Sequence, residues 1–185
     1  MILEHFLLSV NETNCYVLGC RESGQAAIID PGEWNEQLAA FLRDQKLTPR
    51  VVLLTHGHTD HTGGVSDLKR SASATVAAHP DNPLVEKPLR QGNVVEVGTL
   101  KLKVVEVPGH TEDSLAFAIG SEVFAGDALF AGSVGGTPDR EAFERLTRSI
   151  REKLFSLGDD MVIHPGHGPA TTVLIERVFN PFLMA

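Results

Sequence analysis

Three histidines and an aspartate stand close together in the segment T-H-G-H-T-D-H at 55–61. Imidazole nitrogens and carboxylate oxygens are side-chain groups that bind zinc, iron and manganese in proteins. The spacing therefore indicates a metal-binding cluster. Its members are His56, His58, Asp60 and His61. The apolar run at 51–54 precedes this motif and is typical of a buried strand, and turns that follow such strands commonly carry chemistry.

Three later strand candidates each end in a glycine-flanked turn with one more potential ligand. These ligands are His110, Asp127 and His167. If all four strands end at one edge of a sheet, seven potential ligands meet there. Seven exceed the usual four of a zinc site, but they suffice for two metals with three protein ligands each and a shared bridging carboxylate. Closely spaced metal pairs of this kind catalyse hydrolytic reactions.

The hydrophobic pattern predicts the elements that must position these residues. We expect strands at about 2–9, 14–20, 25–30, 50–54, 75–78, 93–97, 100–107, 115–119, 122–126 and 161–163. We expect helices near 33–46, around Val65 and Leu68, and after residue 137. The last of these is predicted to have Thr137 as its N-cap and Pro138 at its first position.

Length and composition favour an ordinary globular protein. A chain of 185 residues that is 42% hydrophobic suits one domain over 1–185 with a sizeable core. The net charge of −8 disfavours a nucleic-acid partner, because neutralising phosphates needs clustered lysine and arginine. We expect no membrane association, because no apolar run approaches about 18 residues. The N-terminus, with Glu4 and no basic segment, is unlike a signal peptide.

The two cysteines, Cys15 and Cys20, lie five residues apart in a predicted strand and therefore point to opposite faces of it. We expect two reduced thiols and a cytoplasmic location. The pattern leaves open whether the protein is a monomer or a homodimer.

The motifs together resemble the metallo-β-lactamase-fold superfamily, and within it the glyoxalase II-like (hydroxyacylglutathione hydrolase-like) branch. The matching segments are T-H-G-H-T-D-H, P-G-H-T at 108–111, G-D-A-L-F at 126–130 and P-G-H-G-P at 165–169. The resemblance extends from D-P-G at 30–32 to N-P-F-L at 180–183. It implies an α/β fold, a four-layer αββα sandwich of two mixed β-sheets flanked by helices, with the metals at one edge.

The same resemblance implies two divalent metal ions, zinc in the first place, with iron or manganese as alternatives. The first metal would be held by His56, His58 and His110. The second would be held by Asp60, His61 and His167, with Asp60 also essential to catalysis. Asp127 would bridge the two metals.

Asp30 allows two interpretations. By the resemblance, it orients the metal loop without touching a metal. An aspartate before Pro-Gly is equally typical of a plain turn.

A hydroxide bridging two metals forms at neutral pH and can attack a carbonyl carbon. A thiolate leaving group needs little protonation, so a thioester suits a site without an obvious general acid. Thioesterase members of the family act on acylated glutathione. We therefore expect a small-molecule thioester substrate of the S-lactoylglutathione type.

Two other functions stay open. A mononuclear-iron persulfide dioxygenase on the same fold would use only His56, His110 and Asp127. A non-catalytic domain would use its metals only to stabilise the fold, with closed coordination, although a structural site does not need two metals. A β-lactamase is disfavoured by the glyoxalase-like motifs.

The chain departs from glyoxalase II in its substrate-binding features. Only 18 residues follow His167, too few for the helical C-terminal domain that binds glutathione. Related short members often carry an arginine where this chain has Gly136, and Arg90 and Arg140 are weaker candidates for an anion anchor. The histidines outside the motifs are expected to be structural or surface residues. These are His5, His79 and His164.

Overall fold

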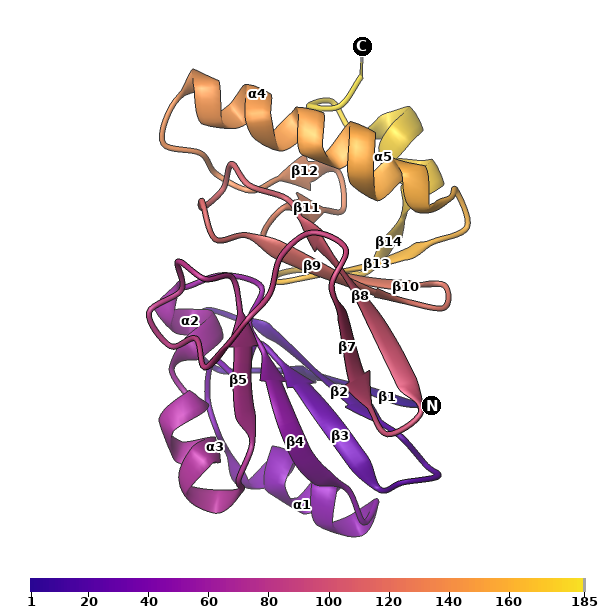
Figure 1. The fold of residues 1–185 in the computed structure, drawn as a ribbon. Helices are drawn as coiled ribbons and strands as arrows, with labels where there is room; N and C mark the ends of the chain where they lie inside the picture. The colour runs from indigo at the N-terminus through magenta and orange to yellow at the C-terminus, as the bar shows by residue number, and fades with distance from the viewer. Residues whose placement is uncertain (185) are drawn as a thin grey trace.

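The computed structural model describes residues 1–184 and places two six-stranded sheets face to face (Figure 1). The first sheet has the order β1-β2-β3-β4-β5-β6 and the second β14-β13-β10-β9-β8-β7. The strands of the first sheet are β1 (Ile2–Leu7), β2 (Asn14–Gly19), β3 (Gln25–Ile29), β4 (Thr48–Leu53), β5 (Thr75–Ala78) and β6 (Lys87–Pro88). Those of the second are β7 (Val94–Val97), β8 (Leu100–Glu106), β9 (Leu115–Ile119), β10 (Glu122–Gly126), β13 (Val162–Pro165) and β14 (Thr171–Thr172).

Both sheets are mixed. In the first, β1, β2 and β3 pair antiparallel, whereas β3 to β6 pair parallel. In the second, only β10 and β13 pair parallel. A small hairpin, β11 (Leu129–Phe130) with β12 (Ser133–Val134), stands apart from both sheets.

Helices cover the outer faces of the two sheets (Figure 1). The helices beside the first sheet are α1 (Glu36–Asp44), α2 (Thr59–Thr62) and α3 (Val65–Ser71); those beside the second are α4 (Arg140–Ser149) and α5 (Val173–Phe179). Three apolar clusters fill the spaces between these layers. One packs Leu38 and Leu68 under the first sheet, one packs Phe117 and Phe124 between the sheets, and one packs Leu146 under α4. Three interfaces make four layers, so the predicted αββα sandwich is confirmed.

The ligand-bearing turns emerge at one edge because of this topology. β10 and β13 are parallel neighbours, and β8 runs the same way as β10 because both are antiparallel to β9. β4 ends opposite them in the first sheet, and the Leu115 N–H donates to the Thr55 carbonyl oxygen across the two sheets at 2.7 Å. The predicted gathering of strand ends is therefore confirmed.

Several predicted boundaries are wrong. Thr137 is not the N-cap of α4, because the Asp139 carboxylate caps the helix by accepting from the Ala142 N–H. The helix then continues through a π-helical turn at Ile150–Leu154 and a 3₁₀ turn at Phe155–Leu157. The helix predicted near 33–46 is shorter, because Asn35 caps it and α1 begins at Glu36.

Other elements were missed by the hydrophobic pattern. The histidine motif contains the short helix α2 instead of a continuous loop. The two-residue strands β6, β11, β12 and β14 are too short to show any periodicity, and α5 leaves much of its apolar surface exposed. The short elements show no repeating apolar signal, whereas the apolar repeat of α5 at Leu174, Ile175, Val178 and Phe179 lies on its exposed face.

The cysteines behave as predicted. Cys15 and Cys20 are both free and buried. Cys15 packs in the cluster beneath α1, whereas the Cys20 thiol lies 3.3 Å from the Thr99 hydroxyl. Among residues 1–184, none of the helices has the length and apolarity needed to cross a bilayer.

Gly32 is predicted to be intolerant of any side chain. A Cβ at this position would lie 1.6 Å from the Asp60 carbonyl oxygen of α2, and backbone cannot move aside cheaply. We expect Gly32→Ala to lower the free energy of unfolding by about 1–3 kcal/mol, as overpacking does elsewhere. Gly136→Ala is the matched control, because a Cβ there meets nothing within 4 Å. Urea denaturation of both variants measures the difference; equal stabilities would contradict the close approach.

Candidate metal centre

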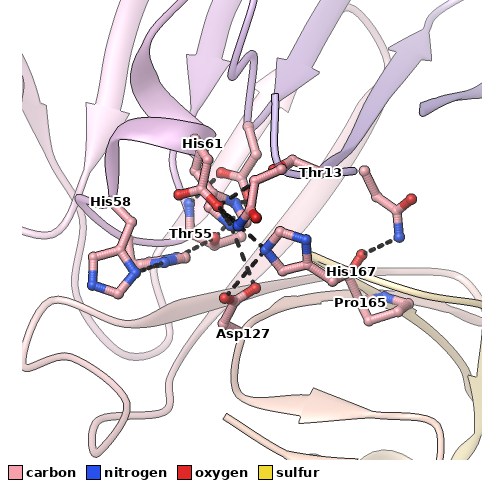
Figure 2. Close-up of polar contacts among 12 residues, drawn as sticks. Thr13, Thr55, His58, His61, Asp127, Pro165 and His167 are labelled. Atoms are coloured by element: carbon pink, nitrogen blue, oxygen red, sulfur yellow. Dashed lines mark hydrogen bonds and ion pairs between the residues drawn. The ribbon is translucent and has the colours of Figure 1, made fainter. Parts of the chain in front are cut away.

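The seven predicted ligand residues lie together in two adjoining groups. The first group is His56, His58, His110 and Asp127; the second is Asp60, His61 and His167. Within each group, one ligand atom per residue lies within 4.8 Å of all the others. Figure 2 shows His58 and His61 on the side of the first sheet, facing Asp127 and His167 from the second.

The first group is centred on the Nδ1 atom of His58. This nitrogen lies 3.0 Å from His56 Nε2 and 3.2 Å from His110 Nε2. Three imidazole nitrogens that point toward one place are the donor set of a bound cation.

The Asp127 carboxylate lies between the two groups. Its Oδ2 atom is 3.7 Å from His110 Nε2 in the first group and 3.6 Å from His167 Nε2 in the second. Its Oδ1 atom is 3.4 Å from His61 Nε2. One carboxylate that faces both groups has the position required of a bridging ligand.

The second group is completed by Asp60. The Oδ2 atom of Asp60 lies 3.4 Å from His167 Nε2 and 4.0 Å from His61 Nε2. Asp60 and His61 come from α2, whereas His167 follows β13, so this group joins the two halves of the chain.

The histidines use their outer nitrogens to hold their rings in place. His61 Nδ1 donates to Asp30 Oδ2 at 2.9 Å, and His110 Nδ1 donates to the Gly136 carbonyl oxygen at 2.6 Å. His56 Nδ1 lies 3.1 Å from the Thr55 hydroxyl. A ring that donates from Nδ1 presents its Nε2 lone pair to the site, which is the arrangement of metal-binding histidines.

Asp30 is almost fully buried, and hydrogen bonds offset the free-energy cost of burying its carboxylate. Oδ1 accepts from the Thr55 N–H at 2.8 Å, and Oδ2 accepts from the Thr55 hydroxyl at 2.6 Å as well as from His61. Its φ of 51° is a left-handed conformation that costs free energy for a residue with a side chain. Of the two interpretations of Asp30, the contacts favour the orientation of ligand residues over a plain turn.

Two buried polar atoms at the centre have no hydrogen-bond partner, His61 Nε2 and Asp127 Oδ1. They face each other at 3.4 Å. Leaving such groups without partners is costly in a buried site. A divalent cation would satisfy both atoms, and the nitrogen and oxygen donors suit zinc, iron or manganese. The residues present therefore fit the metals that the fold implies.

Burial and neighbouring charges shift the pKa values of three of these groups. Burial, with the nearby His61, lowers the pKa of His56 to about 3, so its imidazole is neutral at pH 7. Burial also lowers the pKa of His61, but the Asp30 and Asp127 carboxylates outweigh it and raise that pKa to about 10. Burial raises the pKa of Asp127, but His61 outweighs it and lowers the value to about 2. The proton that this pKa places on His61 at pH 7 therefore supplies positive charge beside the Asp127 carboxylate, and a cation would take its place.

Glycines let the backbone approach the ligands closely. A Cβ at Gly166 would lie 2.1 Å from Asp127 Oδ1 and 2.6 Å from His61 Cε1. In the T-G-G segment, a Cβ at Gly63 would lie 2.7 Å from the Gly32 carbonyl oxygen, and Gly64 precedes α3 as its N-cap. The T-G-G glycines therefore serve both close packing and the start of a helix.

Other histidines and arginines find partners outside the seven residues. His5 contacts Asn14, His79 contacts Arg90, and His164 contacts Glu122. Arg140 pairs with Glu144 on the exposed face of α4. In the described part of the chain, the metal-type groups include none of His5, His79 and His164.

Sequence reasoning missed four residues that contact the seven predicted ligand residues or the loop that carries His167. They are Asn11, Thr13, Asn14 and Thr55. Thr55 is the first residue of the T-H-G-H-T-D-H segment, so its place beside the histidines is visible in the sequence. The segment at 11–14 is typical of a turn between strands, and nothing local shows that it lies against Asp60.

A family model described as the metallo-beta-lactamase superfamily matches residues 8–83 and 79–167. The chain belongs to this superfamily. Its relatives include the hydroxyacylglutathione hydrolase GloC of Haemophilus influenzae, which is 32% identical over 99% of this chain and 98% of its own length.

Solved structures in this superfamily are closely similar. ETHE1 from Myxococcus xanthus matches with a TM-score of 0.88 and 31% identity, over 98% of this chain and 84% of that one. The BLEG-1 B3 metallo-beta-lactamase matches with a TM-score of 0.90 and 30% identity over the whole of both chains. TTHA1623, solved in a di-iron-bound form, matches with a TM-score of 0.84 and 33% identity, over 97% of this chain and all of that one.

We predict that Asp30→Asn weakens metal binding and leaves the fold intact. An amide has one acceptor oxygen where the carboxylate has two, so it cannot accept from Thr55 and His61 as the carboxylate does. The ring of His61 and, through Thr55, the ring of His56 then lose their fixed orientation. Loss of such a supporting contact typically costs 10–100-fold in metal affinity. Competition with a chromophoric chelator measures the change, with circular dichroism as the check on folding. The exposed Asp44→Asn variant is the control, and an Asp30→Asn affinity equal to that of the control would contradict the role of Asp30.

Proposed function

We propose that this protein is a two-metal hydrolase that cleaves thioesters of the hydroxyacylglutathione type. The observation that carries the proposal is the Asp127 carboxylate, whose oxygens face ligand atoms of both groups at 3.4–3.7 Å. A bridging carboxylate is the feature that a two-metal centre needs and a one-metal centre does not. The GloC relative from Haemophilus influenzae supports the substrate class.

Two divalent metals in this centre would provide a hydroxide at neutral pH and stabilise the negative charge that develops on the substrate carbonyl oxygen. The protein contributes the geometry. Asp30 and Thr55 fix the rings of His56 and His61, and the Gly136 carbonyl fixes His110. Because a thiolate leaves without prior protonation, the chain need not place a general acid beside the substrate. This matches a site built only from imidazoles and carboxylates.

The second candidate function is that of a mononuclear-iron persulfide dioxygenase. The three residues it requires, His56, His110 and Asp127, all lie in the first group. This candidate leaves the second group without a role, although His61 Nε2 is buried, lacks a partner and faces Asp127. The geometry therefore favours the hydrolase.

A direct comparison of reactions tests the proposal. Protein purified without chelators is assayed for thiol release from S-lactoylglutathione, for oxygen uptake with glutathione persulfide, and for β-lactam hydrolysis. Thiol release as the dominant activity supports the proposal. Oxygen uptake without thiol release would replace it with the dioxygenase, and dominant β-lactam cleavage would also overturn it.

Asp60 allows a sharper test, because it belongs only to the second group. We expect Asp60→Ala to lose one metal per chain and to lower thioester hydrolysis by about 100-fold or more, since a two-metal mechanism needs both ions. Elemental analysis, activity and circular dichroism are measured on one sample. The exposed Asp44→Ala variant is the control. Full hydrolysis by an Asp60→Ala protein with one metal would refute the two-metal mechanism.

A further inference from the structure

The turn between β1 and β2 lies against the second ligand group, although no motif includes it. Asn11 and Thr13 of this turn, together with Asn14 at the start of β2, contact Asp60 and the loop around His167, which come from opposite halves of the chain. We refer to these three residues as the β1–β2 clamp.

The clamp holds Asp60 through the oxygen that faces the site. Asn11 Nδ2 donates to Asp60 Oδ2 at 2.8 Å, and the Thr13 hydroxyl lies 3.5 Å from the same oxygen. This oxygen is also the one 3.4 Å from His167 Nε2. A carboxylate has two oxygens and about four lone-pair sites, so the bonds from Asn11 and Thr13 fix its direction and leave other lone pairs for a cation.

The clamp holds the His167 loop from both sides. The Asn14 side-chain amide donates to the carbonyl oxygens of Pro165 at 3.0 Å and Gly168 at 2.8 Å. The Asn14 backbone N–H donates to the Gly166 carbonyl oxygen at 2.7 Å, and Thr13 forms a β-bridge with His167 itself.

The surroundings of Asn14 fix which way its amide points. His5 Nε2 donates to Asn14 Oδ1 at 2.7 Å, which leaves Nδ2 as the atom that faces the two carbonyl oxygens. The Tyr16 hydroxyl adds a bond to the Pro165 carbonyl oxygen at 2.7 Å. Asn14 is 2% exposed, so water does not replace these bonds readily.

The first group is held differently. Its rings are fixed by Thr55 and the Gly136 carbonyl, and none of these bonds comes from the clamp. The clamp therefore supports only the second group, whereas Asp127 and the contacts of Asp30 and Thr55 are common to both groups.

We propose that the β1–β2 clamp is a positioning element that sets the affinity of the second metal site independently of the first. Asn11, Thr13 and Asn14 are positioning residues, because they act through Asp60 and His167. The clamp would thus decide whether the protein works with one metal or with two. This inference rests on the two-metal centre of the proposed function.

Asn11→Gly tests the clamp with little risk to folding. Asn11 is exposed and has a φ of 50°, a conformation that glycine adopts readily, so the substitution removes the amide without straining the turn. Glu12→Gly is the matched control: Glu12 is also exposed with a φ of 52°, whereas the bonds to Asp60 come from Asn11 and Thr13. Any effect of added backbone freedom should appear in both variants.

The readout is zinc binding by the metal-free protein in competition with a chromophoric chelator, which yields two dissociation constants. We expect Asn11→Gly to weaken the second site 10–100-fold and leave the first unchanged, with Glu12→Gly like wild type. Turnover should return to near the wild-type kcat at saturating zinc, which a merely misfolded variant would not do. Any of four results would overturn the inference: equal weakening of both sites, no weakening, the same shift in Glu12→Gly, or a kcat that stays low at saturating zinc.

A second variant tests the other side of the clamp. Asn14→Asp keeps the shape but sets a carboxylate oxygen against two carbonyl oxygens, and we expect the same selective loss of the second site. If this buried variant fails to fold, the Asn11→Gly result still decides. A wild-type protein that binds two zinc ions but cleaves no thioester would refute the proposed function and leave the clamp inference standing.

Discussion

The buried carboxylate of Asp30 is the interaction on which the rest of the metal centre depends. A buried charge is costly unless hydrogen bonds compensate it. Asp30 meets this requirement with bonds from the Thr55 N–H, the Thr55 hydroxyl and His61 Nδ1. Through Thr55 it also reaches His56, so one carboxylate orients a histidine of each ligand group. Its left-handed backbone and the glycine two residues later, which admits the Asp60 carbonyl, follow from this placement.

The centre also depends on the packing of the two sheets. His61 belongs to the half that forms the first sheet, and Asp127 to the half that forms the second, yet their unpartnered atoms face each other at 3.4 Å. The bond from the Leu115 N–H to the Thr55 carbonyl joins the sheets beside them. Groups from both halves could bind one cation only when the sandwich is assembled. Metal binding should therefore favour the folded state, since the unfolded chain offers no such cluster.

The sequence was sufficient to predict the four layers and the seven residues that gather at one edge of them. The ligand types stand in local motifs, and each motif follows an apolar run that a buried strand requires. Asp30 was ambiguous, because Asp-Pro-Gly has the same local pattern whether or not its carboxylate reaches Thr55. Asn11 and Asn14 were missed because their partners are far along the chain: Asp60 lies 49 residues from Asn11, and Gly168 lies 154 from Asn14. Contacts of that kind exist only after the fold has formed.

The central claim is that Asp127 is shared by two metal sites supported from different sides. Anomalous X-ray diffraction at the absorption edge of the metal, on crystals of protein loaded with zinc, tests it most directly. We expect two peaks on either side of the Asp127 carboxylate, one near His56, His58 and His110, and the other near Asp60, His61 and His167. A different result would contradict the shared, two-metal centre: a single peak near the first group in zinc-saturated crystals, with His61 Nε2 and Asp60 remote from any metal.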